Sequence, residues 1–313
     1  MQPQPGTVLI AYDGSDDAAA AIRRAGSVLG ARPAVVVHVW ESLAGLLLHT
    51  DVDGLTGSMR DAAEELDQED RFNGERIATE GEELARQAGF DAEAHALQGK
   101  PKAWPVLLEV AEKIDAAVIV IGSRGFGCVK SALIGSVSSG LLHHAGRPVL
   151  VVPPSRDEVG TGPVLIAFDG SDSARAAVAA AGELFAGREA TVETVWVPYA
   201  PVASAGTAGM PAAVASHAVE ELDKSIATRA ETTAAEGARL AAQSGLEARS
   251  TAVEAEGPVW ATIGDSAARQ DSAAIVVGSR GRGALAAAVL GSTSSALVHH
   301  AHAPILVVPP HRG

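Results

Sequence analysis

The chain has 313 residues, a length that suits about two domains, and 47% of them are apolar, which excludes an intrinsically disordered chain. The formal net charge is −14, and no basic stripe overrides it, so a nucleic-acid-binding protein is not expected. Cys128 is the single cysteine, so an internal disulfide is excluded. There is no signal-peptide pattern and no apolar run near the ~20 residues that cross a bilayer, so we expect a cytoplasmic protein without a membrane partner.

Predicted strands and helices alternate through the first half of the chain. In chain order, we expect a strand at 8–13, a helix at 18–30, a strand at 34–40, a helix near 60–88, a strand near 92–97, a helix near 101–113, a strand at 116–122, a helix near 136–145 and a strand at 148–153. This alternation predicts an α/β fold with a parallel sheet and helices on both faces. Ligands of such sheets bind beyond the carboxyl ends of the strands, where the strand order reverses.

The second half of the chain repeats the first. VLIAYDGSD at 8–16 returns as VLIAFDGSD at 164–172, and the same offset brings all four tryptophans into register. A constant offset indicates tandem duplication of a unit of ordinary domain size. We place the domains at 1–154 and 163–313, joined by a linker at 155–162 within a proline-, glycine- and charge-rich junction.

A glycine-rich loop, GSRGFGCVKSALIGSVS at 122–138, follows the fourth predicted strand and returns as GSRGRGALAAAVLGSTS from 278. Its glycines let the backbone approach a ligand, and the helix that opens at Gly135 presents unpaired amides to an anion. Arg124 and Arg280 supply fixed charge, and neighbouring hydroxyls add donors. For one loop alone, a turn with a serine N-cap would be the simpler explanation. The P-loop signature is absent, and the dinucleotide fingerprint is missing after the first strand.

The spacing G-x2-G-x9-G-S of residues 122–136 resembles the ATP-binding motif G-x2-G-x9-G-[ST] of the universal stress protein family, and residues 278–292 repeat it. An aspartate that ends the first predicted strand of each half, Asp13 and Asp169, and a closing H-A-x-x-P-[VI]-L-V-V-P extend the resemblance over nearly the whole chain. The chain is identified as a tandem member of the ATP-binding branch. The resemblance implies two flavodoxin-like (Rossmann-like) three-layer α/β/α domains, each with a five-stranded parallel sheet of order 3-2-1-4-5.

The resemblance also implies one adenine nucleotide site in each domain, with ATP as the cofactor and magnesium expected beside it. The expected ATP-binding residues of the first half are Asp13, Val39, Gly122, Arg124, Gly125, Gly135, Ser136, Val137 and Ser138. Those of the second half are Asp169, Val195, Gly278, Arg280, Gly281, Gly291, Ser292, Thr293 and Ser294. The two affinities need not be equal, because the loops differ at Phe126 versus Arg282, Lys130 versus Ala286 and Val137 versus Thr293.

The two aspartates have an alternative explanation. Asp13 and Asp169 could contact a ligand hydroxyl, since each ends a predicted strand at the binding edge, or they could cap the helix that follows. A catalytic carboxylate is a third interpretation. Their neighbours Asp16 and Asp172 are expected to be helix caps.

Histidine and cysteine residues invite metal or redox hypotheses. The histidines at 143–144, 299–300 and 302 could bind a metal, but exposure at the C-terminal end of a helix explains them more simply. No cysteine or carboxylate cluster accompanies them in the sequence. Cys128 could be a redox sensor, but the second half has Ala284 there, so an incidental small residue is the simpler explanation. The tryptophans are expected to be packing residues.

Three functions compete. A nucleotide-binding stress-response sensor or regulator, not an enzyme, agrees best with two complete motifs. A slow ATPase or autophosphorylating protein is the first alternative, and a nucleotide-free interaction scaffold is the second. The resemblance also implies that the last strands, 148–153 and 304–309, pair within the chain, and a homodimer of the tandem chain is plausible.

Overall fold

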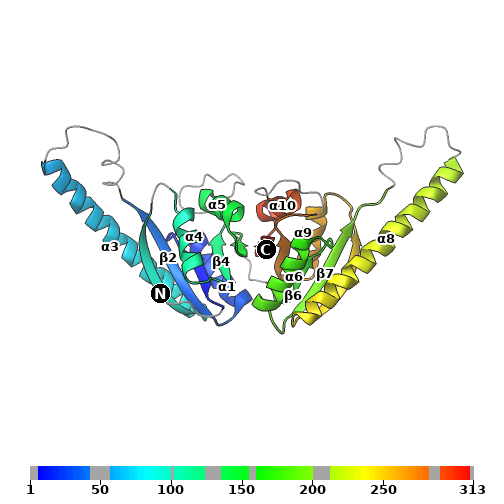
Figure 1. Ribbon diagram of the computed structural model, residues 1–313, viewed down its shortest axis with the longest axis horizontal. Coiled ribbons are helices and arrows are strands. Elements are labelled where there is room, and N and C mark those ends of the chain that lie inside the picture. Colours follow the sequence, from blue (N-terminus) through cyan, green and yellow to red (C-terminus); the bar gives the residue numbers. More distant parts are fainter. Residues whose placement is uncertain are drawn as a thin grey trace. The chain divides into compact units, whose positions relative to one another are not determined.

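The structure, a computed structural model, describes residues 6–42, 57–99, 102–123, 135–154, 160–199, 212–281 and 290–310. The chain forms two compact units, residues 1–158 and 159–313 (Figure 1). The first strand of the second unit begins at Gly162, so the sheet takes in the last residue of the predicted linker. The Gly162 amide donates to the Asp271 carbonyl oxygen at 2.8 Å, which ties this strand end to the second unit.

Strands and helices alternate in the first unit. Its elements are β1 (Val8–Ala11), α1 (Asp16–Leu29), β2 (Pro33–Glu41), α3 (Gly57–Gln87), β3 (Asp91–Gly99), α4 (Trp104–Lys113), β4 (Val118–Gly122), α5 (Ser136–His144) and β5 (Val149–Val152). The sheet has the order β3-β2-β1-β4-β5, and its neighbouring strands are parallel. The order reverses between β1 and β4, which makes this the switch point of the sheet.

The second unit repeats this arrangement. Its elements are β6 (Gly162–Ala167), α6 (Asp172–Leu184), β7 (Glu189–Trp196), α8 (Ala212–Gln243), β8 (Glu247–Glu254), α9 (Val259–Arg269), β9 (Ser272–Gly278), α10 (Ser292–His300) and β10 (Ile305–Val308). The order is β8-β7-β6-β9-β10, again with parallel neighbours. Each unit therefore has the order 3-2-1-4-5 that the family resemblance implied.

Helices cover both faces of each sheet. In the first unit α1 and α3 contact one another and one face of the sheet, and α4 and α5 contact one another and the other face. Burial on both faces explains why β1 and β4 are continuous apolar runs: Leu9 and Ile119 are each 0% exposed. The predicted three-layer α/β/α architecture is confirmed. Among the described helices, none combines the length and the apolarity that a membrane span requires.

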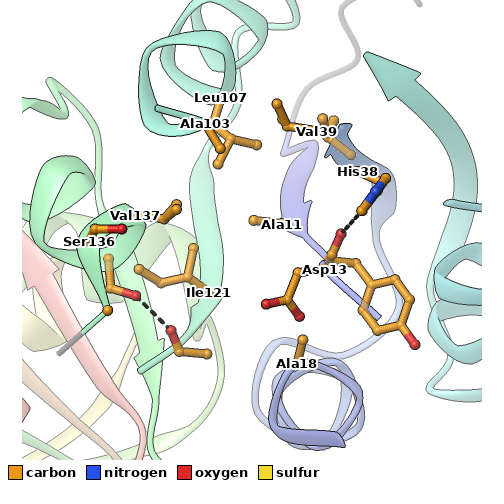
Figure 2. A pocket seen from close by; sticks show the side chains of 15 residues that line it. Ala11, Asp13, Ala18, His38, Val39, Ala103, Leu107, Ile121, Ser136 and Val137 are labelled. Carbon is orange, nitrogen blue, oxygen red and sulfur yellow. Dashed lines mark hydrogen bonds between the residues drawn. The ribbon is translucent and has the colours of Figure 1, made fainter. Parts of the chain in front are cut away.

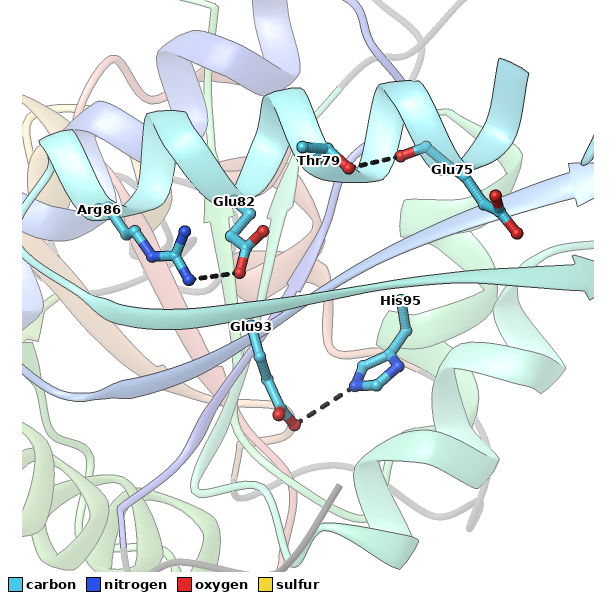
Figure 3. A network of polar contacts seen from close by, with 6 residues as sticks. All are labelled: Glu75, Thr79, Glu82, Arg86, Glu93 and His95. Atoms are coloured by element: carbon cyan, nitrogen blue, oxygen red, sulfur yellow. Dashed lines mark hydrogen bonds and ion pairs between the residues drawn. The ribbon is translucent and has the colours of Figure 1, made fainter. Parts of the chain in front are cut away.

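The long helices α3 and α8 combine a charged outer face with a closely packed inner face. On α3, Arg86 donates to Glu82 one turn away at 2.6 Å, and the nearby strand β3 carries Glu93 3.3 Å from His95 (Figure 3). Gly81 of α3 faces the sheet, where a Cβ atom would come within 2.5 Å of the Tyr12 ring. The glutamates of this segment thus form a solvated face, as its composition indicated.

Serines, not the predicted aspartates, cap the first helix of each unit. The Ser15 hydroxyl accepts from the Ala18 amide, and Ser171 does the same for Ala174. The expectation that Asp16 and Asp172 are caps was therefore wrong. These two residues lie in the first turn, where a carboxylate still interacts favourably with the helix dipole.

Candidate functional site

A cavity of about 190 Å³ lies beyond the carboxyl ends of β1, β2 and β4 in the first unit, at the switch point of the sheet. Ser136 and Val137 lie on one side of it and Asp13 on the other, with Ala103 and Leu107 of the α4 region above (Figure 2). The lining residues are Ala11, Tyr12, Asp13, Ala18, Val37, His38, Val39, Ala103, Leu107, Ile121, Gly122, Gly135, Ser136, Val137 and Ser138.

Most of the residues predicted for the first site meet at this cavity. They are Asp13, Val39, Gly122, Gly135, Ser136, Val137 and Ser138. Arg124 and Gly125 lie outside the described residues, as do Cys128 and the differing loop residues Phe126, Lys130, Arg282 and Ala286. The described ends of the glycine loop therefore form a polar edge of the cavity.

The apolar wall was not predicted as part of the site. Val37, Ala103, Leu107 and Ile121 enclose the cavity from two strands and the segment that opens α4. A signal was present in the sequence, since Ala103 and Leu107 are four residues apart and so share one face of the helix that follows the third strand. This surface can accept a flat apolar group such as a nucleobase.

The glycine loop is closed by two hydrogen bonds at its ends. The Gly135 amide donates to the Ser123 carbonyl oxygen at 3.0 Å, and the Ser138 hydroxyl donates to the Gly122 carbonyl oxygen at 2.9 Å. Ser138 is buried, so its hydroxyl hydrogen serves the loop, and the expectation that it donates to a ligand is not supported by this geometry. Ser136 is exposed and remains available at the start of α5.

Gly135 is the N-cap residue of α5, and no side chain in the described part of the chain caps this helix end. The first amides of a helix have no partner within the helix, and they carry part of the positive end of its dipole. Because this end borders the cavity, it can hold an anionic group such as a phosphate.

Asp13 shapes the turn that follows β1. Its Oδ1 atom accepts from the Ser15 amide at 3.0 Å and from the Ser15 hydroxyl at 2.6 Å, and Ser15 in turn caps α1. Asp13 also lines the cavity, so the turn holds the carboxylate at the site. β1 ends at Ala11, so Asp13 lies in the turn that follows. The prediction that Asp13 ends the strand was wrong.

His38 and Tyr12 are cavity residues that sequence reasoning missed. The His38 Nδ1–H donates to the Tyr12 carbonyl oxygen at 2.9 Å, and in the second unit the Thr194 hydroxyl donates to Phe168 in the same way at 2.7 Å. The Tyr12 hydroxyl donates to Glu80 at 2.9 Å. Burial, together with this glutamate, raises the pKa of Tyr12 well above its usual range, so Tyr12 stays neutral and cannot serve as a base.

The second unit closes its loop in the same manner. The Gly291 amide donates to the Ser279 carbonyl oxygen and the buried Ser294 hydroxyl to the Gly278 carbonyl oxygen, both at 2.7 Å. A Cβ atom at Gly278 would lie 2.5 Å from the Ser173 hydroxyl oxygen, so this close approach requires glycine. The repeated loop thus has a repeated geometry.

The remaining predicted residues of the second site surround this loop. The Arg280 amide donates to the Ser173 hydroxyl at 3.3 Å, and a Cβ atom on Gly281 would lie 3.1 Å from the Asp169 Oδ2 atom. Asp169 accepts from the Ser171 amide at 2.9 Å, which matches the turn at Asp13. Ser292 and Thr293 open α10, and Val195 lies one residue before the end of β7.

The histidines at the helix ends have a packing role. Trp104 stacks on His144 with ring centroids 4.6 Å apart, and Trp260 stacks on His300 at 4.7 Å. Within the described residues, no group of three or more histidines, cysteines or carboxylates could hold a metal ion. Ring stacking therefore accounts for one histidine of each pair and supports the packing role expected of these two tryptophans.

The model of the universal stress protein family matches residues 6–153 and, a second time, residues 161–309. The chain belongs to the universal stress protein family. A universal stress protein of Mycobacterium tuberculosis is 30% identical over 247 residues, which cover 75% of this chain and 76% of that protein. A second one from the same organism is 31% identical over 219 residues, with 66% and 65% covered.

Solved structures agree with the fold of this universal stress protein. A universal stress protein from Archaeoglobus fulgidus aligns with a TM-score of 0.60 at 22% identity, over 97% of this chain and 96% of that chain. A putative universal stress protein from Pseudomonas aeruginosa aligns with a TM-score of 0.54 at 17% identity, over 98% and 94%. The tandem arrangement of two α/β units is therefore shared with these proteins.

Proposed function

We propose that this universal stress protein binds one adenine nucleotide in each unit and acts as a stress-response regulator and not as a turnover enzyme. The observation that carries the proposal is the cavity at the switch point of the first sheet, where Asp13, Val39 and the residues that open α5 meet. A phosphate would be held by the first amides of α5 and by the Ser136 hydroxyl, and the base by the apolar wall. Magnesium would accompany ATP.

The geometry of the second unit is the basis for proposing a second nucleotide site. Its loop ends are joined by the same pair of hydrogen bonds, and Gly281 lies against Asp169. We assign Arg124 and Arg280 the role of neutralising phosphate charge, because they are the charged residues that both loops share.

A binding role is favoured over hydrolysis by the lining of the first cavity. Among the described lining residues, Asp13 is the only carboxylate, and its Oδ1 atom already accepts two hydrogen bonds from Ser15. Phosphoryl transfer needs a group that positions the nucleophile, and usually acidic ligands for magnesium. A slow ATPase or autophosphorylating protein remains the alternative, and a nucleotide-free scaffold is the second.

Freshly purified full-length protein would be denatured, and released nucleotides identified by chromatography and mass spectrometry. We expect one adenine nucleotide per unit, and the ratio of ATP to ADP over time reports hydrolysis. Gly291→Val should remove one of the two, because a Cβ atom there would already lie 3.3 Å from the Ser279 carbonyl oxygen. Gly264→Ala, which points into open space on α9, is the matched control. If no nucleotide is released and ATP does not bind on titration, the proposal is wrong.

We further propose that residues 148–153 and 304–309 pair antiparallel within one chain, on the strength of the family resemblance. Residues before one strand would then lie near residues after the other. In a Cys128→Ser background, cysteines placed at Gly146 and Pro310 should cross-link within a single chain. Cross-links between chains would indicate the homodimer instead.

A further inference from the structure

The second unit contains a buried polar layer that the first unit lacks. The layer lies between β7 and the α9–β9 segment and consists of the buried residues Thr191, Glu193, Thr262, Ser266 and Ser272 and the half-buried Gln270. At the matching positions the first unit has Val35, Val37, Val106, Val110, Ile114 and Ala116. An apolar interface between helix and sheet in one unit is therefore polar in the other.

Hydrogen bonds satisfy much of this layer. The Thr191 hydroxyl donates to Gln270 at 2.8 Å, and Arg249 of β8 donates to the Thr191 hydroxyl oxygen at 3.0 Å. On α9, Arg269 donates to the Ser266 hydroxyl oxygen at 3.0 Å. The bond to Gln270 ties the residue after α9 to β7, the Arg249 bond joins β8 to β7, and the Arg269 bond lies within α9.

Two members of the layer, Glu193 and the Ser272 hydroxyl, have no hydrogen-bond partner among the described residues, and Glu193 is the ionisable one. Its side chain is 1% exposed, and neither carboxylate oxygen accepts a hydrogen bond from the described residues. Burial raises the pKa of Glu193 to about 7, while the nearby Ser266 hydroxyl and the Arg269 charge act in the opposite direction and only partly offset it. An unpaired buried carboxylate is costly, so the neutral acid is the form that this environment favours.

Glu193 occupies the position in the second unit that a cavity-lining residue has in the first, and we infer from this match that it lies in the wall of the second site. Val37, its counterpart, lines the cavity of the first unit. Glu193 is in register with Ala167 on β6, whose counterpart Ala11 also lines that cavity. On the helix above, Val259 and Ile263 match the cavity residues Ala103 and Leu107.

Few charged groups face Glu193 from the elements packed against it. Its register partners, Ala167 on β6 and Thr251 on β8, are uncharged. Arg269 on α9 and Arg249 on β8 are the cations of these elements, and Asp265 on α9 is exposed. The other anions are Glu247 and Glu254, exposed at the two ends of β8, and Asp169 in the turn after β6. Glu193 is therefore a titratable group that the wall around Val37 lacks, whereas the first cavity has Tyr12 and His38 where the second unit has Phe168 and Thr194.

We propose that Glu193 couples ligand binding at the second site to a proton, so that the affinity of this site for an anionic nucleotide rises more steeply than that of the first site as the pH falls. The proposal rests on the proposed nucleotide function. An ionised carboxylate in a wall of low dielectric repels bound phosphate, whereas the protonated acid does not. By linkage, a bound anionic ligand repels the ionised carboxylate and so raises the pKa of Glu193. The protein therefore takes up part of a proton when the ligand binds.

The test uses the full chain with one of the two sites blocked by a substitution. Ala11→Phe occludes the first cavity and leaves the second site, and Ala167→Phe does the converse. Each variant is titrated with ATP by calorimetry at about pH 6 and about pH 8, in buffers of different ionisation enthalpy. If the bound ligand raises the pKa of Glu193 by about one unit, we expect the dissociation constant of the second site to rise about fivefold more than that of the first between about pH 6 and about pH 8. ATP ionisation affects both sites alike and cancels in this comparison.

Glu193→Gln and Glu193→Val should each abolish the difference between the sites and the proton uptake of the second site. Valine is the residue that the first unit has at this position, and glutamine keeps the size and polarity of glutamate without the ionisable group. If either phenylalanine variant fails to fold, the two phases of a wild-type titration give the same comparison. Binding at both sites with equal pH dependence would overturn the proton coupling and leave the nucleotide function intact. Binding at neither site would overturn the nucleotide function, and the coupling with it.

Discussion

The Ser138 hydroxyl and the Gly122 carbonyl oxygen, 16 residues apart in the chain, are joined by a hydrogen bond of 2.9 Å that draws the start of α5 to the end of β4. Ser294 and Gly278 repeat this bond at 2.7 Å in the second unit. The bond fixes the glycine loop at both of its ends. It therefore fixes the separation of these two segments at the edge of the cavity.

Ser138→Ala should weaken nucleotide binding in the first unit without removing a ligand contact. The substitution leaves a carbonyl at the loop end without its donor, so we expect a loss of about 1 kcal/mol in the free energy of unfolding. Chemical denaturation measures the loss, and ATP titration the affinity. Ser139→Ala, one residue along α5 and absent from the cavity lining, is the control. Equal affinities for the two variants would contradict a role for the bond in shaping the site.

Gly81→Ala should destabilise the first unit by about 1–3 kcal/mol, because overpacking forces the helix or the ring to shift. The new methyl group would meet the Tyr12 ring at 2.5 Å. Gly264→Ala on α9 adds a methyl group in open space, so helix propensity alone should stabilise the protein by about 0.5–1 kcal/mol. Thermal unfolding of the two variants should show shifts of opposite sign; shifts of the same sign would contradict the close packing of α3 on the sheet.

The second unit should lose stability as the pH rises from mildly acidic to mildly alkaline values. The folded state holds the Glu193 proton more tightly than the unfolded state, because burial raises the pKa from 4.5 to about 7. The stabilisation is therefore complete below about pH 4.5 and is lost as the pH rises through about 7, with a total of about 3 kcal/mol.

Denaturation of Glu193→Gln across this pH range measures the effect. The variant should show a flatter profile than the wild type, and Glu193→Val should be the more stable protein at about pH 8. Glu231→Gln, at an exposed position of α8, controls for the loss of one negative charge. A wild-type profile parallel to that of Glu193→Gln would contradict the buried, proton-holding state of this residue.

Ser15→Ala should cost about 1 kcal/mol in the free energy of unfolding, because it removes the N-cap of α1. Asp16→Asn keeps the cap and removes only a favourable interaction with the helix dipole, worth about 0.3–1 kcal/mol and screened by salt. Denaturation at low and high salt separates the two effects: the Ser15 cost should persist in salt and the Asp16 cost should shrink. A larger cost for Asp16→Asn at high salt would reverse the assignment of the cap.

The order of the elements could be read from the sequence because burial on two faces leaves apolar runs such as that around Leu9. The polar edge of the first cavity was equally readable, since glycine spacing and the residues that open α5 are local features. The end of β1 was not, because Tyr12 is apolar enough to continue the strand and only the turn at Asp13 stops it. The cap was misassigned because Ser15 and Asp16 are adjacent and both suit a helix start.

Features that depend on contact between distant segments were not predictable. Leu107 reaches the cavity from a helix that the motif does not include. Glu193 lies in β7 between Val192 and Thr194, and nothing local shows that helix α9 covers it. The repeat held the only signal, because the position matched by Glu193 is occupied by Val37 in the first half.

The confinement of the polar layer to one unit gives the chain an internal reference. Two sites on one polypeptide meet the same nucleotide concentration, temperature and salt. While both are far from saturation, the ratio of their occupancies depends on the ratio of their affinities and no longer on how much ligand is present. A chain with one wall that carries a proton and one that does not would thus report acidity ratiometrically, separated from the energy charge of its surroundings.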